Sequence, residues 1–248
     1  PRTDDSWSYE DLARHIEVMA GKLHDAGIGP GDTIGLHYPS SREYIVYTYA
    51  LWRCGASVAP IAVELVNDEK EAVCKGIHLT AVISGENSTD VFAPFRAGSP
   101  IALNDDVILI RFSPANGGHP EAFAGVNPAF LRFSSGTTGT SKGVILSHET
   151  ILERIKAANV ALELGPDDRV IWLLSMSYHF AVSIVAYLTF GSTIVLCRNH
   201  FGSTIVKTTA RHQGTFIYGS PVHYDLMAHD RSGTLLPNVR LAISTAMY

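Results

Sequence analysis

One segment of the chain combines glycine, hydroxyl and lysine residues in a pattern that could hold a chain of phosphates. It reads Phe-Ser-Ser-Gly-Thr-Thr-Gly-Thr-Ser-Lys-Gly over residues 133–143. Glycines let the backbone approach a ligand closely and adopt positive φ. Successive backbone N–H groups in such a loop form a concavity that binds anions. The hydroxyls donate further hydrogen bonds and Lys142 adds a positive charge, so we expect a phosphate chain to bind here.

This loop differs from the Walker type, in which Gly-Lys is followed by Ser or Thr and then by a helix. Here Ser141 precedes Lys142 and Gly143 follows it, and the next residues, 144–146, are Val-Ile-Leu. The pattern therefore predicts a loop that joins two strands. A flexible surface linker has a similar composition, but a buried apolar strand on each side argues against that reading.

A second candidate is the segment Ser-Tyr-His-Phe at residues 177–180, which follows a strand-like run at residues 170–174. Histidine is the side chain most suited to proton transfer near neutral pH. A single histidine among apolar residues is, however, more often a hydrogen-bonded core residue. The residues alone therefore leave the role of His179 open.

The order of elements predicts how these segments are held. Ser8 and Asp11 have the spacing of a helix-capping box, and apolar residues at helical spacing follow them. Helices and strands then alternate, which predicts an α/β fold with two mainly parallel β-sheet lobes flanked by helices. The Gly- and Pro-rich residues 114–128 suggest a boundary. We expect a first α/β part at residues 1–125 and a second, carrying the phosphate-binding loop, at 126–248.

Composition excludes several classes of protein. Of the 248 residues 46% are hydrophobic and only 17% are charged, which argues against a disordered chain. The net charge is -5 and there is no basic run, so we expect no nucleic-acid partner. Three distant cysteines and a polar N-terminal segment favour a reducing, cytoplasmic location. We expect no metal site formed by clustered side chains.

One uncharged stretch, residues 170–197, has the length of a membrane span. Polar residues such as Ser175 and His179, together with Gly191, interrupt it throughout. We therefore predict three buried pieces, a strand, a short helix and a second strand, and no membrane span.

The loop at residues 133–143 closely resembles the phosphate-binding signature of the adenylate-forming (AMP-binding) superfamily. This superfamily includes acyl-CoA and aryl-CoA synthetases, the adenylation domains of nonribosomal peptide synthetases, and luciferases. Ser141 stands where the family usually has proline. The resemblance extends over essentially the whole chain, including residues 7–12, 29–34 and 55–61. It implies the N-terminal adenylation domain of such an enzyme.

The resemblance implies a two-step reaction, in which ATP and a carboxylic acid give an acyl-adenylate and pyrophosphate, and a thiol then takes the acyl group. The thiol belongs to CoA or to a carrier-protein phosphopantetheine, and Mg²⁺ accompanies ATP. Lys142 and His179 are the implied catalytic residues, and Tyr178, His179, Phe180 and Ser220 the implied substrate-binding residues. The implied ATP-binding residues are Ser134, Ser135, Gly136, Thr137, Thr138, Gly139, Thr140, Ser141, Lys142, Gly143, Thr245 and Ala246.

Departures from the family pattern shape three further expectations. No Asp lies between Phe180 and Ser183, where relatives that activate amino acids hold the substrate ammonium, so an aryl or aliphatic acid is favoured. The later family motifs, including the Glu that assists magnesium, are absent, so we expect an incomplete domain that is inactive alone. The alternatives are a non-catalytic module that binds nucleotide or acyl groups, and an unrelated NTPase, which would release ADP instead of AMP.

Overall fold

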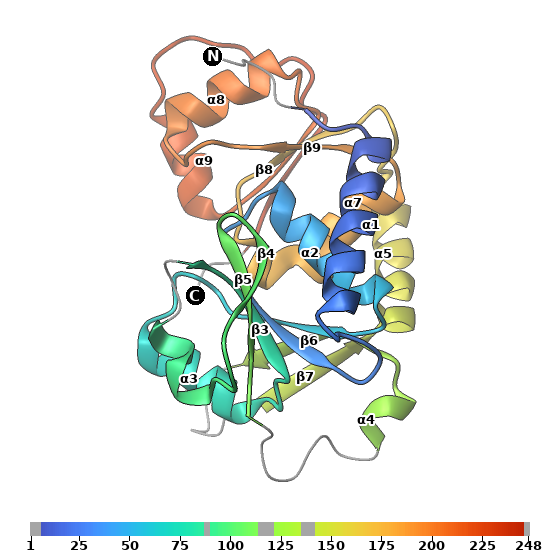
Figure 1. Ribbon diagram of the computed structural model, residues 1–248. Coiled ribbons are helices and arrows are strands. Elements are labelled where there is room, and N and C mark those ends of the chain that lie inside the picture. Colours follow the sequence, from blue (N-terminus) through green and yellow to red (C-terminus); the bar gives the residue numbers. More distant parts are fainter. Residues whose placement is uncertain (1–5, 87–89, 114–121, 135–141, 246–248) are drawn as a thin grey trace. The chain divides into compact units, whose positions relative to one another are not determined.

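The computed structural model describes residues 6–86, 90–113, 122–134 and 142–245 (Figure 1). The chain divides into two compact units, Pro1–Thr150 and Ile151–Tyr248. This division lies later than the expected boundary after residue 125, because the strands at residues 128–134 and 142–147 pair with each other and join the sheet of the first unit. The hairpin that flanks the predicted phosphate loop therefore belongs to the first unit.

The first unit contains a seven-stranded sheet with the order β4-β5-β3-β1-β2-β6-β7. The central pairs, β3-β1, β1-β2 and β2-β6, are parallel, whereas the pairs at both margins are antiparallel. The expectation of a mainly parallel sheet therefore holds only for its centre, because short connections turn both margins back as hairpins. The strands are β1 (Thr33–His37), β2 (Ser57–Pro60), β3 (Ala81–Gly85), β4 (Ile101–Asn104), β5 (Val107–Arg111), β6 (Pro128–Ser134) and β7 (Lys142–Ser147).

The first helix of this unit begins where the sequence predicts it. The capping box at the start of α1 is confirmed, since Ser8 Oγ accepts a hydrogen bond from the Asp11 backbone and the Asp11 carboxylate accepts one from the Ser8 backbone. Gly27 then reverses the chain with φ +80°. The helical elements are α1 (Tyr9–Asp25), α2 (Arg42–Arg53), α3 (Asn67–Gly76), the 3₁₀ helix η2 (Asp90–Phe95), α4 (Ala122–Gly125) and α5 (His148–Leu162), which runs across the boundary between the units.

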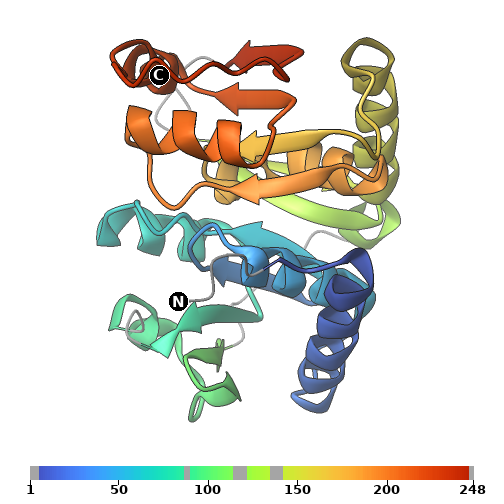
Figure 2. The same cartoon turned by 90° about the horizontal axis from the view of Figure 1, so that it is seen from above.

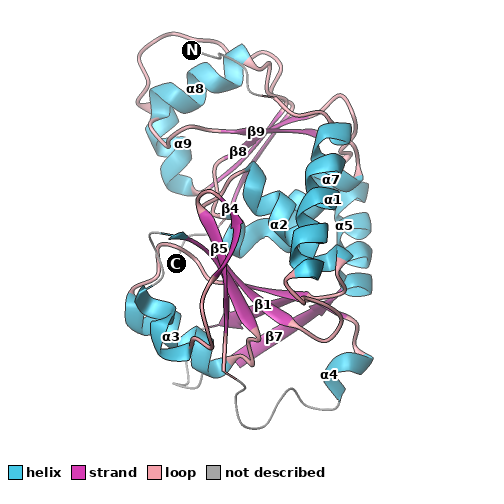
Figure 3. Ribbon diagram, in the orientation of Figure 1, coloured by secondary structure: helices cyan, strands magenta, loops and turns pink. Residues whose placement is uncertain are grey.

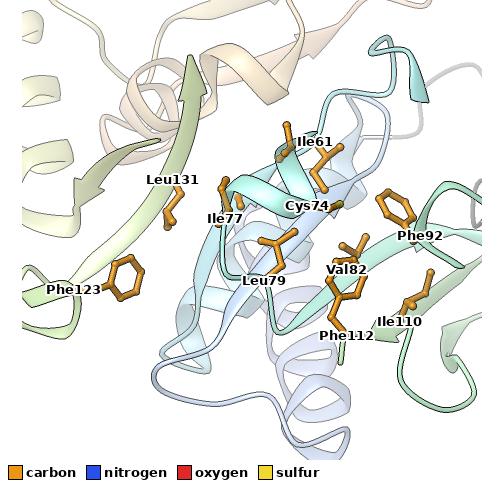
Figure 4. Close-up of a cluster of buried hydrophobic side chains, with 12 residues drawn as sticks. Ile61, Cys74, Ile77, Leu79, Val82, Phe92, Ile110, Phe112, Phe123 and Leu131 are labelled. Atoms are coloured by element: carbon orange, nitrogen blue, oxygen red, sulfur yellow. The ribbon is translucent and has the colours of Figure 1, made fainter. Parts of the chain in front are cut away.

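The core of the first unit joins α3 and η2 to the sheet (Figure 4). Cys74 of α3 and Phe92 of η2 pack with Val82 of β3 and Ile110 of β5, and all four are buried. Burial of large apolar side chains stabilises a fold by roughly 1.5–3 kcal/mol each. The same cluster includes Leu131 of β6, so it also holds the strand that leads into the predicted phosphate loop.

The second unit contains a four-stranded sheet with the order β11-β10-β8-β9, in which every pair is parallel. All four arrows accordingly point the same way (Figure 2). Ile171, Val195 and Ile217 of the sheet pack with Ile205 of α8. The elements are β8 (Arg169–Trp172), α6 (Met176–His179), the π-helical turn η3 (Phe180–Ile184), α7 (Val185–Thr189), β9 (Thr193–Leu196), α8 (Gly202–Arg211), β10 (Phe216–Gly219), α9 (Pro221–Ala228) and β11 (Leu241–Ser244).

The uncharged stretch of residues 170–197 forms a strand, a short helical segment and a second strand, as the sequence predicts. In the part of the chain that the structure describes, no helix has both the length and the apolar character needed to cross a membrane.

The strand order of the second unit creates a topological switch point. The chain leaves β8 to form β9 on one side, and then returns to form β10 on the other side. In open α/β sheets the crevice outside the carboxyl ends of such a pair of strands is where ligands bind. The carboxyl ends of β8 and β10 carry Trp172 and Tyr218, which are register partners.

The opposite, amino-terminal edge of the same sheet is held by one carboxylate. Asp168, which is 5% exposed, precedes β8 and accepts hydrogen bonds from Arg240 Nε and Nη2 at 2.8 and 2.7 Å. It also accepts bonds from Thr215 Oγ1 and the Gly165 backbone at 2.7 and 3.0 Å. Asp168 therefore ties the starts of β8, β10 and β11 together.

Candidate functional site

The predicted phosphate loop lies in the sequence between the antiparallel strands β6 and β7, and β7 is labelled in Figure 3. The prediction that it joins two strands is therefore confirmed. The last residue of β6, Ser134, pairs with the first residue of β7, Lys142, so the two ends of the loop are side by side. Residues 135–141 lie outside the described residues, as do the side chains of Ser134 and Lys142. The contacts expected of the loop residues therefore stay predictions.

Two contacts anchor the strand that leads into the loop. Phe130 of β6 is the parallel register partner of Val58 in β2. The indole Nε1 of Trp52 on α2 donates a hydrogen bond to the Ala129 carbonyl at 2.7 Å. The two contacts hold β6 against β2 and α2.

The predicted loop contains the residue types expected at a phosphate site. Between Ser134 and Lys142 the sequence is Ser-Gly-Thr-Thr-Gly-Thr-Ser. Such residues supply backbone N–H groups and hydroxyl donors, and the lysine at position 142 follows them directly. Within the described ranges no group of three or more His, Cys, Asp or Glu side chains could hold a metal ion.

The second group of predicted residues gathers at the carboxyl edge of the sheet in the second unit. Tyr178, His179 and Phe180 follow β8, Ser220 follows β10, and Thr245 follows β11. The Thr245 backbone N–H donates a hydrogen bond to the Gly219 carbonyl at 2.9 Å, which places it beside the end of β10. Ala246 lies outside the described residues. The fold thus brings predicted residues from three parts of the chain to one edge.

His179 lies in a corner between two aromatic side chains. Its ring centroid is 6.4 Å from that of Trp172 and 5.8 Å from that of Tyr218, with interplanar angles of 70° and 86°. Such edge-to-face contacts orient a ring without charging it. Directly after His179 the helix widens into the π-helical turn η3. Turns of this kind are rare and occur frequently at functional sites.

The neighbours of His179 differ in exposure. Tyr178 is 43% exposed, whereas Phe180 is fully buried. Tyr178 is therefore open to a ligand, and Phe180 supports the turn from inside. Their contacts with substrate remain predictions.

Ser220 has a structural role at the start of α9. It is buried and stands before Pro221, as the sequence predicts for a helix cap. The Ser220 backbone N–H donates to His223 Nδ1 at 3.0 Å, and the Ser220 hydroxyl lies 2.9 Å from the same nitrogen. Burial, together with nearby His200, lowers the pKa of His223. The substrate contact expected of Ser220 stays a prediction.

Sequence reasoning missed Trp172 and Tyr218. Both lie in short apolar strands, where an aromatic residue is an ordinary core residue. Only the pairing of β8 with β10 brings them together beside His179. A tryptophan at the end of a strand that precedes a candidate histidine is the one local signal that points to them.

The first unit carries the predicted phosphate loop, and the second unit carries the predicted substrate residues at one edge of its sheet. The sequence profile described as "AMP-binding enzyme" matches residues 2–247. The chain belongs to this family, whose members are adenylate-forming enzymes.

Individual relatives are distant and longer. The chain is 28% identical over 199 residues to the "Anguibactin system regulator" of Vibrio anguillarum, covering 77% of this chain and 18% of that protein. It is 25% identical over 194 residues to "Nonribosomal peptide synthetase opaA" of Aspergillus ustus, covering 78% and 5%. The chain thus spans a small part of the curated relatives it matches.

Among solved structures, the fold is similar to o-succinylbenzoate CoA synthetase (MenE) of Bacillus subtilis in complex with an acyl-adenylate. The TM-score is 0.82 at 15% identity, covering 99% of this chain and 64% of that one. This similarity confirms the predicted fold class, the α/β N-terminal domain of an adenylate-forming enzyme.

Proposed function

We propose that this chain is part of an enzyme that activates a carboxylic acid with ATP, releases pyrophosphate, and passes the acyl group to a thiol. The observation that carries the proposal is the hairpin of β6 and β7, whose paired ends, Ser134 and Lys142, close a Gly/Ser/Thr loop. The family match over residues 2–247 supports it. The thiol is that of CoA or of a carrier-protein phosphopantetheine.

In the first step a carboxylate oxygen bonds to the α-phosphorus of ATP, and the bond from that phosphorus to the pyrophosphate oxygen breaks. Negative charge then grows on the departing pyrophosphate. Fixed donors aimed at such charge stabilise the transition state. Ser135, Thr137 and Thr138 donate from hydroxyls, and Lys142 contributes its ammonium.

At the other predicted site, His179 orients the acid. Its ring, held edge-on by Trp172 and Tyr218, offers a hydrogen-bonding nitrogen to the reacting carboxylate. Tyr178 and Phe180 border the acyl group, and Thr245 and Ala246 border adenine. Each cysteine is a free thiol, in keeping with a cytoplasmic enzyme.

The experiment is exchange of labelled pyrophosphate into ATP, catalysed by the natural polypeptide that carries this chain, with aryl, aliphatic and amino acids offered separately. Lys142→Ala should lower the exchange rate about 10²–10³-fold, the usual cost of removing one donor to a transition-state anion. Lys156→Ala, on the exposed side of α5, is the matched control.

The 248-residue chain by itself should bind ATP without exchange, because it spans only part of its relatives. Exchange by this chain alone would refute that part of the proposal. ATP binding without exchange by the natural polypeptide would instead favour a non-catalytic binding module.

A further inference from the structure

We propose that Trp172 determines which acid is accepted: its indole N–H donates a hydrogen bond to an acceptor atom in the acyl part of a planar carboxylic acid that carries no charge besides its carboxylate. The inference rests on the proposed function and deepens it by naming the class of acid. It concerns the carboxyl edge of the sheet in the second unit.

The first observation is a buried donor that the fold does not use. Trp172 is 3% exposed, and its Nε1 has no hydrogen-bond partner within the described part of the chain. Buried donors in folded proteins are almost always paired. Trp52 shows the ordinary arrangement, because its Nε1 donates to the Ala129 carbonyl at 2.7 Å. The Trp172 N–H is therefore available to a ligand.

The second observation is where this donor lies. Trp172 is the last residue of β8 and the register partner of Tyr218 at the end of β10. These two strands flank the switch point, where open α/β sheets bind ligands. The ring of His179 contacts both side chains. The unused donor thus belongs to the edge at which the predicted substrate residues gather.

The surroundings select the acid. The ring centroids of Trp172 and Tyr187 lie 6.0 Å apart, and the rings of His179 and Tyr218 also lie beside the indole, so the surroundings are aromatic and favour a planar acyl group. Burial raises the pKa of Tyr187, which stays neutral. Residues 170–197 contain no Asp, Glu, Lys or Arg to pair with a second charge on the acid. A buried ammonium without a partner is costly, so the acid carries no charge beyond its carboxylate.

A competing use for the donor is internal. The Trp172 N–H could point at the face of Tyr187 or Tyr218, which would satisfy it weakly. In that case Trp172→Phe would lower stability but leave the choice of acid unchanged. The two readings therefore differ in selectivity, which can be measured.

The test compares benzoic acid with the isomeric pyridinecarboxylic acids, which have the same shape but carry one ring nitrogen as acceptor. Pyrophosphate exchange is measured for the natural polypeptide, for Trp172→Phe, and for the control Trp7→Phe. At least one pyridine acid should be preferred over benzoic acid. The preference, as a ratio of kcat/KM, should fall about tenfold in Trp172→Phe, the usual effect of one lost hydrogen bond, and stay unchanged in Trp7→Phe.

A second readout does not depend on turnover. The chain has three tryptophans, so the indole N–H resonance of Trp172 is identified by its loss in Trp172→Phe. The preferred pyridine acid should move this resonance downfield, and benzoic acid should not. An unchanged preference, an unmoved resonance, or exchange with amino acids alone would overturn the inference while leaving the proposed function intact. Absence of exchange with every acid would refute the proposed function, and the inference with it.

Discussion

The carboxylate of Asp168 should be the most sensitive point of the second unit. Its side chain is 7% exposed and accepts two hydrogen bonds from Arg240, whose side chain is 38% exposed. Arg240→Leu would leave Asp168 buried with Thr215 and the Gly165 backbone as its remaining donors among the described residues. Asp168→Asn would instead leave the Arg240 guanidinium without its carboxylate partner, but water can reach this side chain and hydrogen-bond to it.

The two variants should therefore differ in cost. Breaking a buried pair typically costs about 3–5 kcal/mol, and the exposure of Arg240 reduces this to about 3 kcal/mol for Arg240→Leu. Asp168→Asn keeps one acceptor oxygen and should cost about 1.5 kcal/mol. Arg169→Leu, which removes an exposed arginine bonded to Gln213, is the matched control and should cost less than about 0.5 kcal/mol.

The dependence on pH gives a second check. Burial raises the pKa of Asp168, but the hydrogen bonds from Arg240, Thr215 and Gly165 outweigh it, so the pKa is lowered. The stability that the Asp168 carboxylate contributes is present above the pKa of the unfolded state and is lost as pH falls through the pKa of the folded state. In Arg240→Leu the pKa of Asp168 should be lowered less, so stability should fall less over this pH range.

The assay is urea unfolding, with hydrogen exchange of the backbone amides of β8, β10 and β11 to localise the effect. The reasoning would be refuted if Arg240→Leu cost no more than Asp168→Asn, or if the loss of protection were absent from these strands.

Three further predictions concern other parts of the chain. Gly202→Ala should destabilise the second unit by about 2 kcal/mol or more, because its Cβ would lie 1.9 Å from the Leu226 carbonyl oxygen; thermal unfolding that matches the parent would contradict this. Burial, with the charge of a nearby lysine, lowers the pKa of His37 to about 4. As pH falls from about 6.5 to 4 the unfolded chain takes up a proton that the folded chain does not, so stability falls. His37→Leu should flatten this part of the pH profile of urea unfolding. Burial raises the pKa of Cys74 to about 12, so iodoacetamide should modify it far more slowly than Cys54 until the chain unfolds; equal rates, followed by mass spectrometry, would show that Cys74 is accessible.

Local signals in the sequence predicted much of the fold. Ser8 and Asp11 predicted the start of α1, and the Gly/Ser/Thr loop with apolar flanks predicted a connection between two strands. These features depend on residues a few positions apart. β4 was not predicted, because only Leu103 of its four residues is buried, so the strand shows little hydrophobic pattern.

Long-range pairing set the limit of prediction. The parallel pairing of β2 with β6 places the strands that flank the predicted phosphate loop in the first unit. The residues around position 130 contain no local pattern that predicts this pairing. The position of Trp172 beside Tyr218 and His179 likewise depends on the pairing of β8 with β10. The sequence thus predicted the candidate histidine, but the aromatic side chains that orient it became visible only in three dimensions.

The most direct test of the central claim is the identity of the nucleotide product. The natural polypeptide is incubated with ATP, an accepted acid and the thiol acceptor, and the products are followed by phosphorus NMR. If the acyl-adenylate forms at the α-phosphate, AMP and pyrophosphate should appear in equal amounts. The rate at which both form should fall sharply in Lys142→Ala. Accumulation of ADP and inorganic phosphate would contradict the account, because it would mean transfer at the γ-phosphate.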